Sequence, residues 1–348
     1  MPRSRIYSFH NYTQNKNQKK VPSSGNLSSL SLFLCLCWSA CAIMTFSLSF
    51  THPIFSRHVH SAALSLSSSP PPPPPGFFFL SPPTPTSLRF DFLYRVPQRS
   101  AAFSAAETAA LLQDTASSAA VLAGAYALVF TFDTLTQKEL IQQNLSRKLV
   151  HILSGLLFAV SWPIFSNSLL ARYFASVVPL VNCVRLVIHG LSLADDQRLI
   201  KSVTREGNPK ELLRGPLYYV LILILCALVF WRESPVGLIS LAMMCGGDGV
   251  ADILGRRFGS SKLPYNRNKS WVGSISMFVF GFFISVGMLY YYSVLGYFQL
   301  DWGWTMCRVA LVSLVATVVE SLPFTTVVDD NISVPLATMI AAYFSFRP

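Results

Sequence analysis

Eight apolar segments, separated by polar stretches, follow one another from residue 116 to the end of the chain. Crossing the hydrocarbon core of a bilayer takes roughly 20 apolar residues in helical form, and several of these segments approach that length. The pattern predicts an all-α fold, a polytopic membrane helical bundle with six to eight transmembrane helices. The segments are Ala116–Phe132, Leu149–Phe165, Leu169–Leu191, Pro216–Trp231, Pro235–Ala251, Trp271–Phe298, Met306–Leu322 and Ile332–Phe346.

The charged residues between these segments are expected to gather on one face of the membrane. If all eight segments cross, alternate loops and adjoining segment ends place thirteen Lys/Arg and eleven Asp/Glu on one side. Topology control by basic residues would explain the lysines and arginines but would not require the eleven acids. We therefore expect the active-site loops on this face. They are residues 133–148, 192–215, 252–270 and 323–331.

The N-terminal region differs from the rest of the chain. Residues 1–90 contain seven Lys/Arg, many serines and no acidic residue, and an unbroken proline run occupies Pro70–Pro75. Such a composition is typical of an organelle transit peptide and a disordered, Pro/Ser-rich linker. We expect this leader to cover residues 1–100, with its boundary between 60 and 105, and the membrane domain to cover 116–348.

One apolar run within the leader, Leu30–Phe50, fits a transit peptide poorly because lysines precede it, as in a signal anchor. It could instead be an additional span, or the functional start could be Met44. The formal charge of +11 comes mainly from residues 1–100, which hold nine basic residues and one acid. This distribution argues against a nucleic-acid partner. The seven cysteines show no paired spacing, which argues against a structural zinc site or a disulfide framework.

The stretch Cys245–Ser274, CGGDGVADILGRRFGSSKLPYNRNKSWVGS, is a charged interruption between apolar segments. Asp248 and Asp252 are four residues apart, so on a helical end they would share a face and repel each other. A Mg²⁺ ion between them would relieve this repulsion. Gly247 and Gly249 would let the backbone come close to a ligand. The alternative is a glycine-rich turn with an incidental pair of acids.

The second half of this stretch predicts an anion site. Lys269, Ser270 and the free amides around Gly273 stand where the next helix begins, which suits a phosphate group. Arg256 and Arg257 add positive charge nearby. We interpret the stretch as the binding site of a nucleotide triphosphate, although the Walker A spacing is absent. The alternative is a lysine at the membrane surface with Ser270 capping the helix.

Three further acids belong to the predicted chemistry. Glu320 lies in an apolar run, where a carboxylate is costly and usually functional. Asp329 and Asp330 are candidate metal ligands or a base; otherwise they are solvated loop acids. A basic group at the start of the second segment offers phosphate contacts, with membrane anchoring as the alternative. Its members are Arg147, Lys148 and His151.

Five motifs together resemble the plant chloroplast phytol kinases of the polyprenol kinase family. This family includes farnesol kinases and is distantly similar to dolichol kinases and membrane cytidylyltransferases. The resemblance covers about residues 119–346. The motifs are SRKLVHILSGLLF (146–158), LIKSVTREG (199–207), LLRGPLYYVL (212–221), MMCGGDGVADILGRRFGSSKLPYNRNKSWVGSISMF (243–278) and VVESLPFTTVVDDNISVPLAT (318–338).

The resemblance implies transfer of the γ-phosphoryl group of CTP or UTP to phytol, giving phytyl phosphate for tocopherol (vitamin E) synthesis at a chloroplast membrane. It implies Asp248 and Asp252 as metal or catalytic carboxylates and Lys269 and Ser270 as nucleotide contacts. Asp252 or Glu320 would act as base. Farnesol or geranylgeraniol is the alternative acceptor. Cytidylyl transfer to a phospholipid and ion-coupled transport are the alternative functions.

Overall fold

The computed structural model describes the membrane domain, and the predicted leader with its apolar run lies outside the described residues. The two alternatives for residues 30–50 therefore stay predictions. The described part is residues 104–347 without 195–198, 201–202, 205–206 and 324–327.

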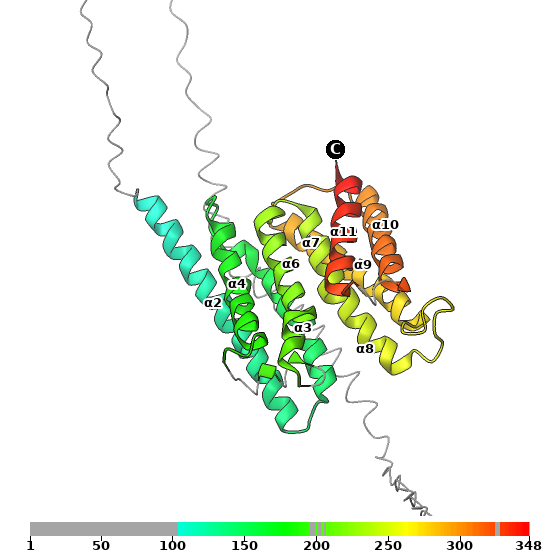
Figure 1. The fold of residues 1–348 in the computed structure, drawn as a ribbon. Helices are drawn as coiled ribbons and strands as arrows, with labels where there is room; N and C mark the ends of the chain where they lie inside the picture. Colours follow the sequence, from blue (N-terminus) through cyan, green and yellow to red (C-terminus); the bar gives the residue numbers. More distant parts are fainter. Residues whose placement is uncertain (1–103, 195–198, 201–202, 205–206, 324–327, 348) are drawn as a thin grey trace, which may run out of the picture. The chain divides into compact units, whose positions relative to one another are not determined.

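Most of the described part of the chain is helical, and no strand is found there, as the apolar pattern predicts. Within the described residues, each of the eight apolar segments corresponds to one helix or continuous helical run (Figure 1). Their bounds are α2 (Ala105–Gln137), α3 (Gln143–Ser161), η1 (Trp162–Ile164), α4 (Ala171–Gly190), η2 (Pro209–Leu213), α6 (Gly215–Val229), α7 (Pro235–Leu241), η3 (Ala242–Asp248), α8 (Gly249–Phe258), α9 (Trp271–Val294), α10 (Trp302–Ser321) and α11 (Asp330–Phe346).

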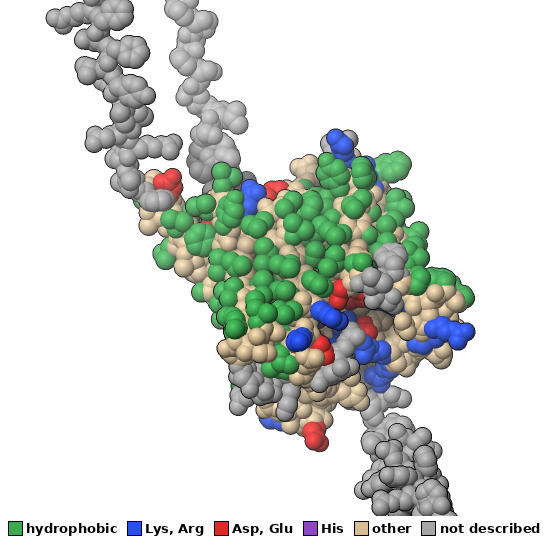
Figure 2. All heavy atoms as spheres, in the orientation of Figure 1, with side chains coloured by type: hydrophobic (Ala, Val, Ile, Leu, Met, Phe, Trp, Pro, Cys, Tyr) green, Lys and Arg blue, Asp and Glu red, His purple; other side chains and the backbone are tan. Residues whose placement is uncertain are grey.

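Six of the helical runs in the described chain are long and apolar enough to cross a membrane. The two others are α3, whose first half carries several basic groups, and α11, which has only 17 residues. Figure 2 shows apolar side chains as a broad band over the helices, with lysine, arginine and acidic side chains gathered mainly below it. This distribution is that of a polytopic membrane protein.

The helices form two neighbouring groups within the domain. Helices α2, α3, α4 and α6 pack beside one another, as do α7 to α11, and contacts of α3 with η3 and α8 and of α6 with α11 join the groups (Figure 1). Because successive helices run in opposite directions, the start of α3, the end of α10 and the start of α11 lie at one end of the bundle.

One helical run through α7, η3 and α8 lies at the centre of the domain, and most of it is buried. The sequence pattern placed a charged loop over 252–270, but the helix continues to Phe258, so only 259–270 are non-helical. Residues Ala242–Asp248 form a π-helix. Such segments occur often at functional sites because they shift the side chains that follow relative to a regular helix.

At the opposite end of the bundle, two buried charged residues hold the connection between α3 and α4. The Asp114 carboxylate accepts hydrogen bonds from the Ser166 backbone N–H at 2.7 Å and from the Ser166 and Ser168 hydroxyls. The Arg232 guanidinium donates to the Phe165 carbonyl at 2.9 Å and the Ser166 carbonyl at 2.7 Å. Buried charges need such partners, and here they fix a turn rather than a functional site.

Candidate active site

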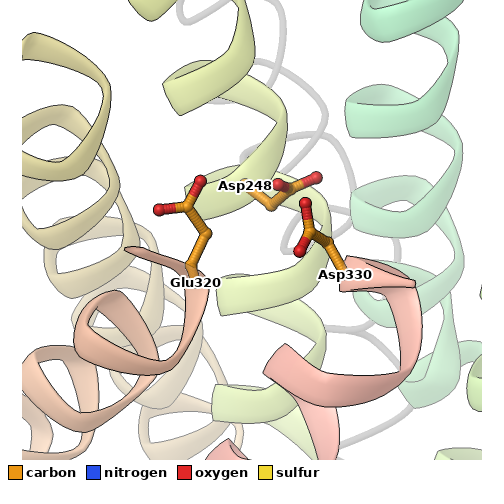
Figure 3. Close-up of side chains that lie close together, drawn as sticks. All are labelled: Asp248, Glu320 and Asp330. Atoms are coloured by element: carbon orange, nitrogen blue, oxygen red, sulfur yellow. The ribbon is translucent and has the colours of Figure 1, made fainter. Parts of the chain in front are cut away.

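Three carboxylates from segments far apart in the sequence meet at the charged end of the bundle. Asp248 ends the π-helix η3, Glu320 lies in the last turn of α10, and Asp330 is the first residue of α11. One oxygen from each side chain lies within 4.8 Å of the others, and the three point toward one another in Figure 3. Asp248 and Glu320 are buried, at 7% and 4% exposure. We call these three residues the carboxylate cluster.

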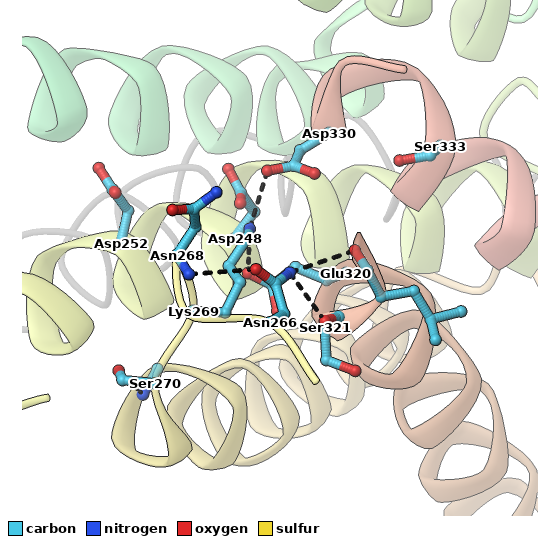
Figure 4. Close-up of polar contacts among 12 residues, drawn as sticks. Asp248, Asp252, Asn266, Asn268, Lys269, Ser270, Glu320, Ser321, Asp330 and Ser333 are labelled. Carbon is cyan, nitrogen blue, oxygen red and sulfur yellow. Dashed lines mark hydrogen bonds and ion pairs between the residues drawn. The ribbon is translucent and has the colours of Figure 1, made fainter. Parts of the chain in front are cut away.

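The adjoining segments hold the cluster in place through local hydrogen bonds. Asp329 caps α11 by accepting from the Asn331 backbone N–H at 3.0 Å, which fixes where Asp330 begins the helix. The Asn266 side chain donates to the Ser321 carbonyl at 3.0 Å and so joins the loop after α8 to the end of α10 (Figure 4). The loop therefore brings its lysine to the cluster.

Lys269 lies between two of the carboxylates. Its ammonium group donates to Glu320 Oε1 and, at 2.9 Å, to Asp330 Oδ2 (Figure 4). Burial alone would lower the pKa of Lys269, but the nearby charges of Glu320, Asp248 and Asp330 outweigh it and raise this pKa above its ordinary value. Lys269 is therefore a permanent positive charge in the cluster at neutral pH.

A second lysine reaches the cluster from α3. Lys148 Nζ lies 3.4 Å from Asp248 Oδ2 and 3.4 Å from Asp252 Oδ2, and so bridges the predicted pair of carboxylates. Asp252 also accepts from Arg256 Nε at 2.7 Å, one helical turn away. Asp252 thus forms ion pairs with Lys148 and Arg256 and lies at the edge of the site.

Unpartnered oxygens in the cluster fit a divalent cation. Among the described residues, Glu320 Oε2, Asp330 Oδ1 and Asn331 Oδ1 are buried and accept no hydrogen bond. A buried acceptor without a partner costs about 1–3 kcal/mol, and hard divalent cations prefer such oxygen ligands. Asp248, Glu320 and Asp330 are therefore the residues that would hold a metal. This set overlaps the predicted ligands at Asp248 and Asp330 but contains Glu320 in place of Asp252 and Asp329.

The glycines predicted to approach a nucleotide lie at helix contacts. A Cβ on Gly249 would come within 2.3 Å of Ile152 Cγ1, so this glycine lets α8 lie against α3. A Cβ on Gly247 would lie 3.4 Å from the Gly281 Cα, and one on Gly273 would lie 3.5 Å from the Gly255 Cα. Helix packing therefore requires a glycine at position 249, whereas a Cβ at position 247 would make only an ordinary contact. Contact of these glycines with a nucleotide stays a prediction.

The remaining predicted nucleotide residues fall into two kinds. Ser270 is buried and caps α9, accepting from the Gly273 backbone N–H at 3.2 Å, as its alternative interpretation expected. Arg256 and Arg257 are exposed on the last turn of α8. Arg256 already pairs with Asp252, and the Ser270 hydroxyl is engaged in the helix cap, so contact of these residues with a nucleotide stays a prediction.

A cavity of about 830 Å³ opens beside the cluster, between α2, α3, α4 and α6. Asp248, Asp329 and Asp330 line its polar end, as do all three basic residues predicted at the start of α3. Two of these are Arg147 and Lys148; the third, His151, packs against Tyr219 with 4.1 Å between ring centroids.

Sequence reasoning missed several of the groups that line this cavity. Tyr219 donates to the His151 carbonyl at 2.8 Å and accepts or donates a hydrogen bond with Ser154. Asn182 and Arg185 line the wall formed by α4. Arg185 offered a usable signal, because an arginine inside an apolar segment is costly and is a functional hypothesis by default. Tyr219 offered none, since tyrosines are common at segment ends.

Similarity to known proteins identifies the family. The chain is 67% identical over 267 residues to a probable chloroplastic phytol kinase 1 of Glycine max, covering 77% of this chain and 87% of that protein. It is 66% identical over 249 residues to the chloroplastic phytol kinase 1 of Arabidopsis thaliana, which covers 72% of this chain and 82% of that protein. The chain belongs to the phytol kinase family.

A probable phytol kinase 1 from Oryza sativa subsp. japonica is 62% identical over 242 residues, covering 70% of this chain and 77% of that protein. No family model matches the chain, and no solved structure matches it. For this member of the phytol kinase family, the geometry of the cluster and the cavity is therefore the basis for assigning roles to residues.

Proposed function

We propose that the protein is a phytol kinase of the chloroplast membrane, which transfers the γ-phosphoryl group of CTP to phytol with Mg²⁺ and returns phytol to tocopherol synthesis. The observation that carries this proposal is the carboxylate cluster, with its unpartnered buried oxygens, at the polar end of a cavity between apolar helices. Membership of the phytol kinase family supports phytol as the acceptor. Farnesol and geranylgeraniol are the competing acceptors.

Phosphoryl transfer asks the protein mainly for positioning and for neutralisation of negative charge. A divalent cation held by Asp248, Glu320 and Asp330 would supply part of that charge neutralisation. Arg147 and Lys148, on the same end of the cavity, provide further positive charge for the triphosphate. The nucleotide thus lies across the mouth of the cavity, with its γ-phosphate toward the cluster.

The transfer itself forms one bond and breaks another. The alcohol oxygen bonds to the γ-phosphorus, the bond from that phosphorus to the β,γ-bridging oxygen breaks, and CDP leaves. The hydroxyl proton passes to a carboxylate. Asp248 and Asp330 both belong to the carboxylate cluster and line the cavity. We assign this role to Asp248, because Asp330 already accepts a hydrogen bond from Lys269 at 2.9 Å. Glu320 and Asp252, the bases favoured by the sequence, are not among the cavity-lining residues.

The test uses the purified full-length chain with phytol, Mg²⁺ and CTP labelled either in the γ-phosphate or in the cytosine. We expect γ-label, and no cytosine label, in the lipid product. An Asp248→Asn variant should lose roughly 10²–10³-fold in kcat, the usual effect of removing one electrostatic contact to a transition state. Asp301→Asn is the matched control, because Asp301 caps α10 on the far side and asparagine caps equally well.

Two results would reject the proposal. Full turnover by the Asp248→Asn variant would remove the cluster from the reaction. Cytosine label in the lipid would instead assign cytidylyl transfer, the second enzymatic interpretation of the same charged residues. Replacing CTP by UTP in the same assay decides the nucleotide, and offering phytol, geranylgeraniol and farnesol together decides the preferred alcohol.

A further inference from the structure

The cavity changes character along its length. Its polar end lies at Asp248 and Asp330, whereas most of the wall beyond it is formed by aliphatic and aromatic side chains, with Asn182 and Arg185 on α4 as polar exceptions. Leu157 on α3 comes nine residues after Lys148, which is about 14 Å further along the helix. The apolar lining residues include Val121, Leu122, Leu157, Phe158, Val178 and Leu223.

Helix α2 shows how far the cavity extends. Its lining residues run from Asp133 at the charged end to Val121, twelve residues away, which corresponds to about 18 Å of helix. They recur at spacings of three or four, so they form one stripe of α2. A cavity that extends this far along one helix has room for a long flexible chain.

We propose that this cavity holds the apolar chain of a prenyl alcohol, with the hydroxyl group at Asp248 and the chain directed along α2 toward Val121. The inference rests on the proposed function, whose substrate is the occupant. The nucleotide fits the deep part poorly, because a base and ribose placed among leucine, valine and phenylalanine would lose hydrogen bonds to water, at about 1–3 kcal/mol for each group.

Ala125 on α2 is the residue placed to limit the length of the chain. It lines the cavity eight residues from Asp133, about 12 Å from the polar end, and its side chain is small. A phenylalanine here would project into the space and separate the deep half from the mouth. Ala127, two residues further along the same helix, is exposed and does not line the cavity.

The experiment compares Ala125→Phe with Ala127→Phe, using phytol, with its sixteen-carbon backbone, and the shorter farnesol as acceptors. For Ala125→Phe we expect the ratio of kcat/KM for phytol to that for farnesol to fall roughly tenfold or more, as when a pocket loses room for part of a substrate. The ratio should be unchanged in Ala127→Phe. An unchanged ratio in Ala125→Phe, or an equal fall in both variants, overturns the inference.

Photolabelling of the unmodified protein tests the same site without relying on turnover or on a variant's folding. The probe is a prenyl alcohol carrying a diazirine at the end of its chain. Labelling of the lining residues of α2, α4 or α6, prevented by excess phytol, supports the inference. Labelling confined to outward-facing residues such as Phe130 and Leu221, or prevented by excess galactolipid but not by phytol, overturns it.

These measurements separate the two proposals. If phytol protects the cavity from labelling but no γ-phosphate reaches it, the proposed function fails and the binding site stands. Suppose instead that phytol is phosphorylated, that Ala125→Phe leaves the preference for phytol over farnesol unchanged, and that the label lies outside the cavity. The proposed function then stands and the assignment of the cavity fails.

Discussion

Replacing Lys269 with methionine would remove the ammonium group that contacts both Glu320 and Asp330. Methionine keeps most of the length and apolar volume of the lysine side chain, so the change is mainly electrostatic. It leaves Glu320 and Asp330 without the cation that contacts both, in a cluster whose carboxylate oxygens lie within 4.8 Å of one another. Their mutual repulsion then opposes folding.

The size of the effect follows from burial. The Glu320 side chain is 5% exposed and that of Lys269 is 21% exposed, so solvent screens the pair only in part. Removing one partner of a buried ion pair costs about 3–5 kcal/mol. We take about 3 kcal/mol because Lys269 reaches solvent, which corresponds to a fall in Tm of roughly 6–12 °C for a domain of this size.

The assay is thermal unfolding of the purified protein in detergent with EDTA, followed by tryptophan fluorescence. Adding Mg²⁺ should raise the Tm of the Lys269→Met variant more than that of the wild type, because the variant has one more uncompensated negative charge to bind the cation. Lys262→Met is the control: Lys262 is exposed in the same loop, and such surface changes stay within about 0.5 kcal/mol. Equal Tm values for Lys269→Met and wild type in EDTA, or equal gains from Mg²⁺, would refute the reasoning.

The pH dependence of this difference has a definite sign. Neighbouring carboxylates raise the pKa of Lys269, so its stabilising charge is fully present below its unfolded value of about 10.4 and is lost only as the pH rises through the higher folded value. The part of the Tm difference between wild type and Lys269→Met that comes from the Lys269 charge should therefore be constant between about pH 7 and 9. A difference that vanished by pH 9 would show that Lys269 loses its proton too early for this role.

Two further predictions concern packing and the far end of the bundle. Gly249→Ala should cost about 1–3 kcal/mol of stability by overpacking, because its Cβ would meet Ile152. Gly287→Ala, with open space around it, should be neutral or stabilising. Equal unfolding temperatures for the two variants would contradict this prediction. Asp114→Ala should lower Tm by leaving buried donors unpaired, at about 1–3 kcal/mol each, yet leave kcat per folded molecule unchanged, which an activity assay at low temperature checks.

The helices were predictable because each apolar segment must bury its backbone polar groups in helical hydrogen bonds when it lies in a membrane. The helix boundaries were harder to predict. The stretch after Asp248 is rich in glycine and charge, which suggested a loop, but α8 continues to Phe258. Its glycines are compatible with a helix because α3 and α9 lie against them and compensate for their low propensity.

Glycine in this stretch has two meanings that a sequence does not separate. A missing Cβ at Gly249 allows close approach by anything, a ligand or another helix, and the sequence shows only that the Cβ is missing. The structure places Ile152 there. The same ambiguity applies to Ser270, whose hydroxyl suits a phosphate and a helix N-terminus equally well and in the structure caps α9.

The sequence indicated individual residues of the candidate site but not which of them contact one another. Glu320 stood out as a carboxylate within an apolar run, and Lys269 as a lysine at a helix start. Their contact joins residues 51 apart in the sequence, and that of Lys148 with Asp248 joins residues 100 apart. Such pairs depend on how the helices pack, which the period of apolar residues does not specify.

The charge of the site gives the unpartnered oxygens their significance. Four carboxylates face three cations, so before any ligand arrives the site has one formal negative charge in excess. A triphosphate alone would add to that excess, whereas a divalent cation would reverse it and also supply the buried oxygens of Glu320 and Asp330 with a partner. The arrangement therefore favours a nucleotide that arrives with its metal over a free one. The groups counted are Asp248, Asp252, Glu320 and Asp330 against Lys148, Arg256 and Lys269.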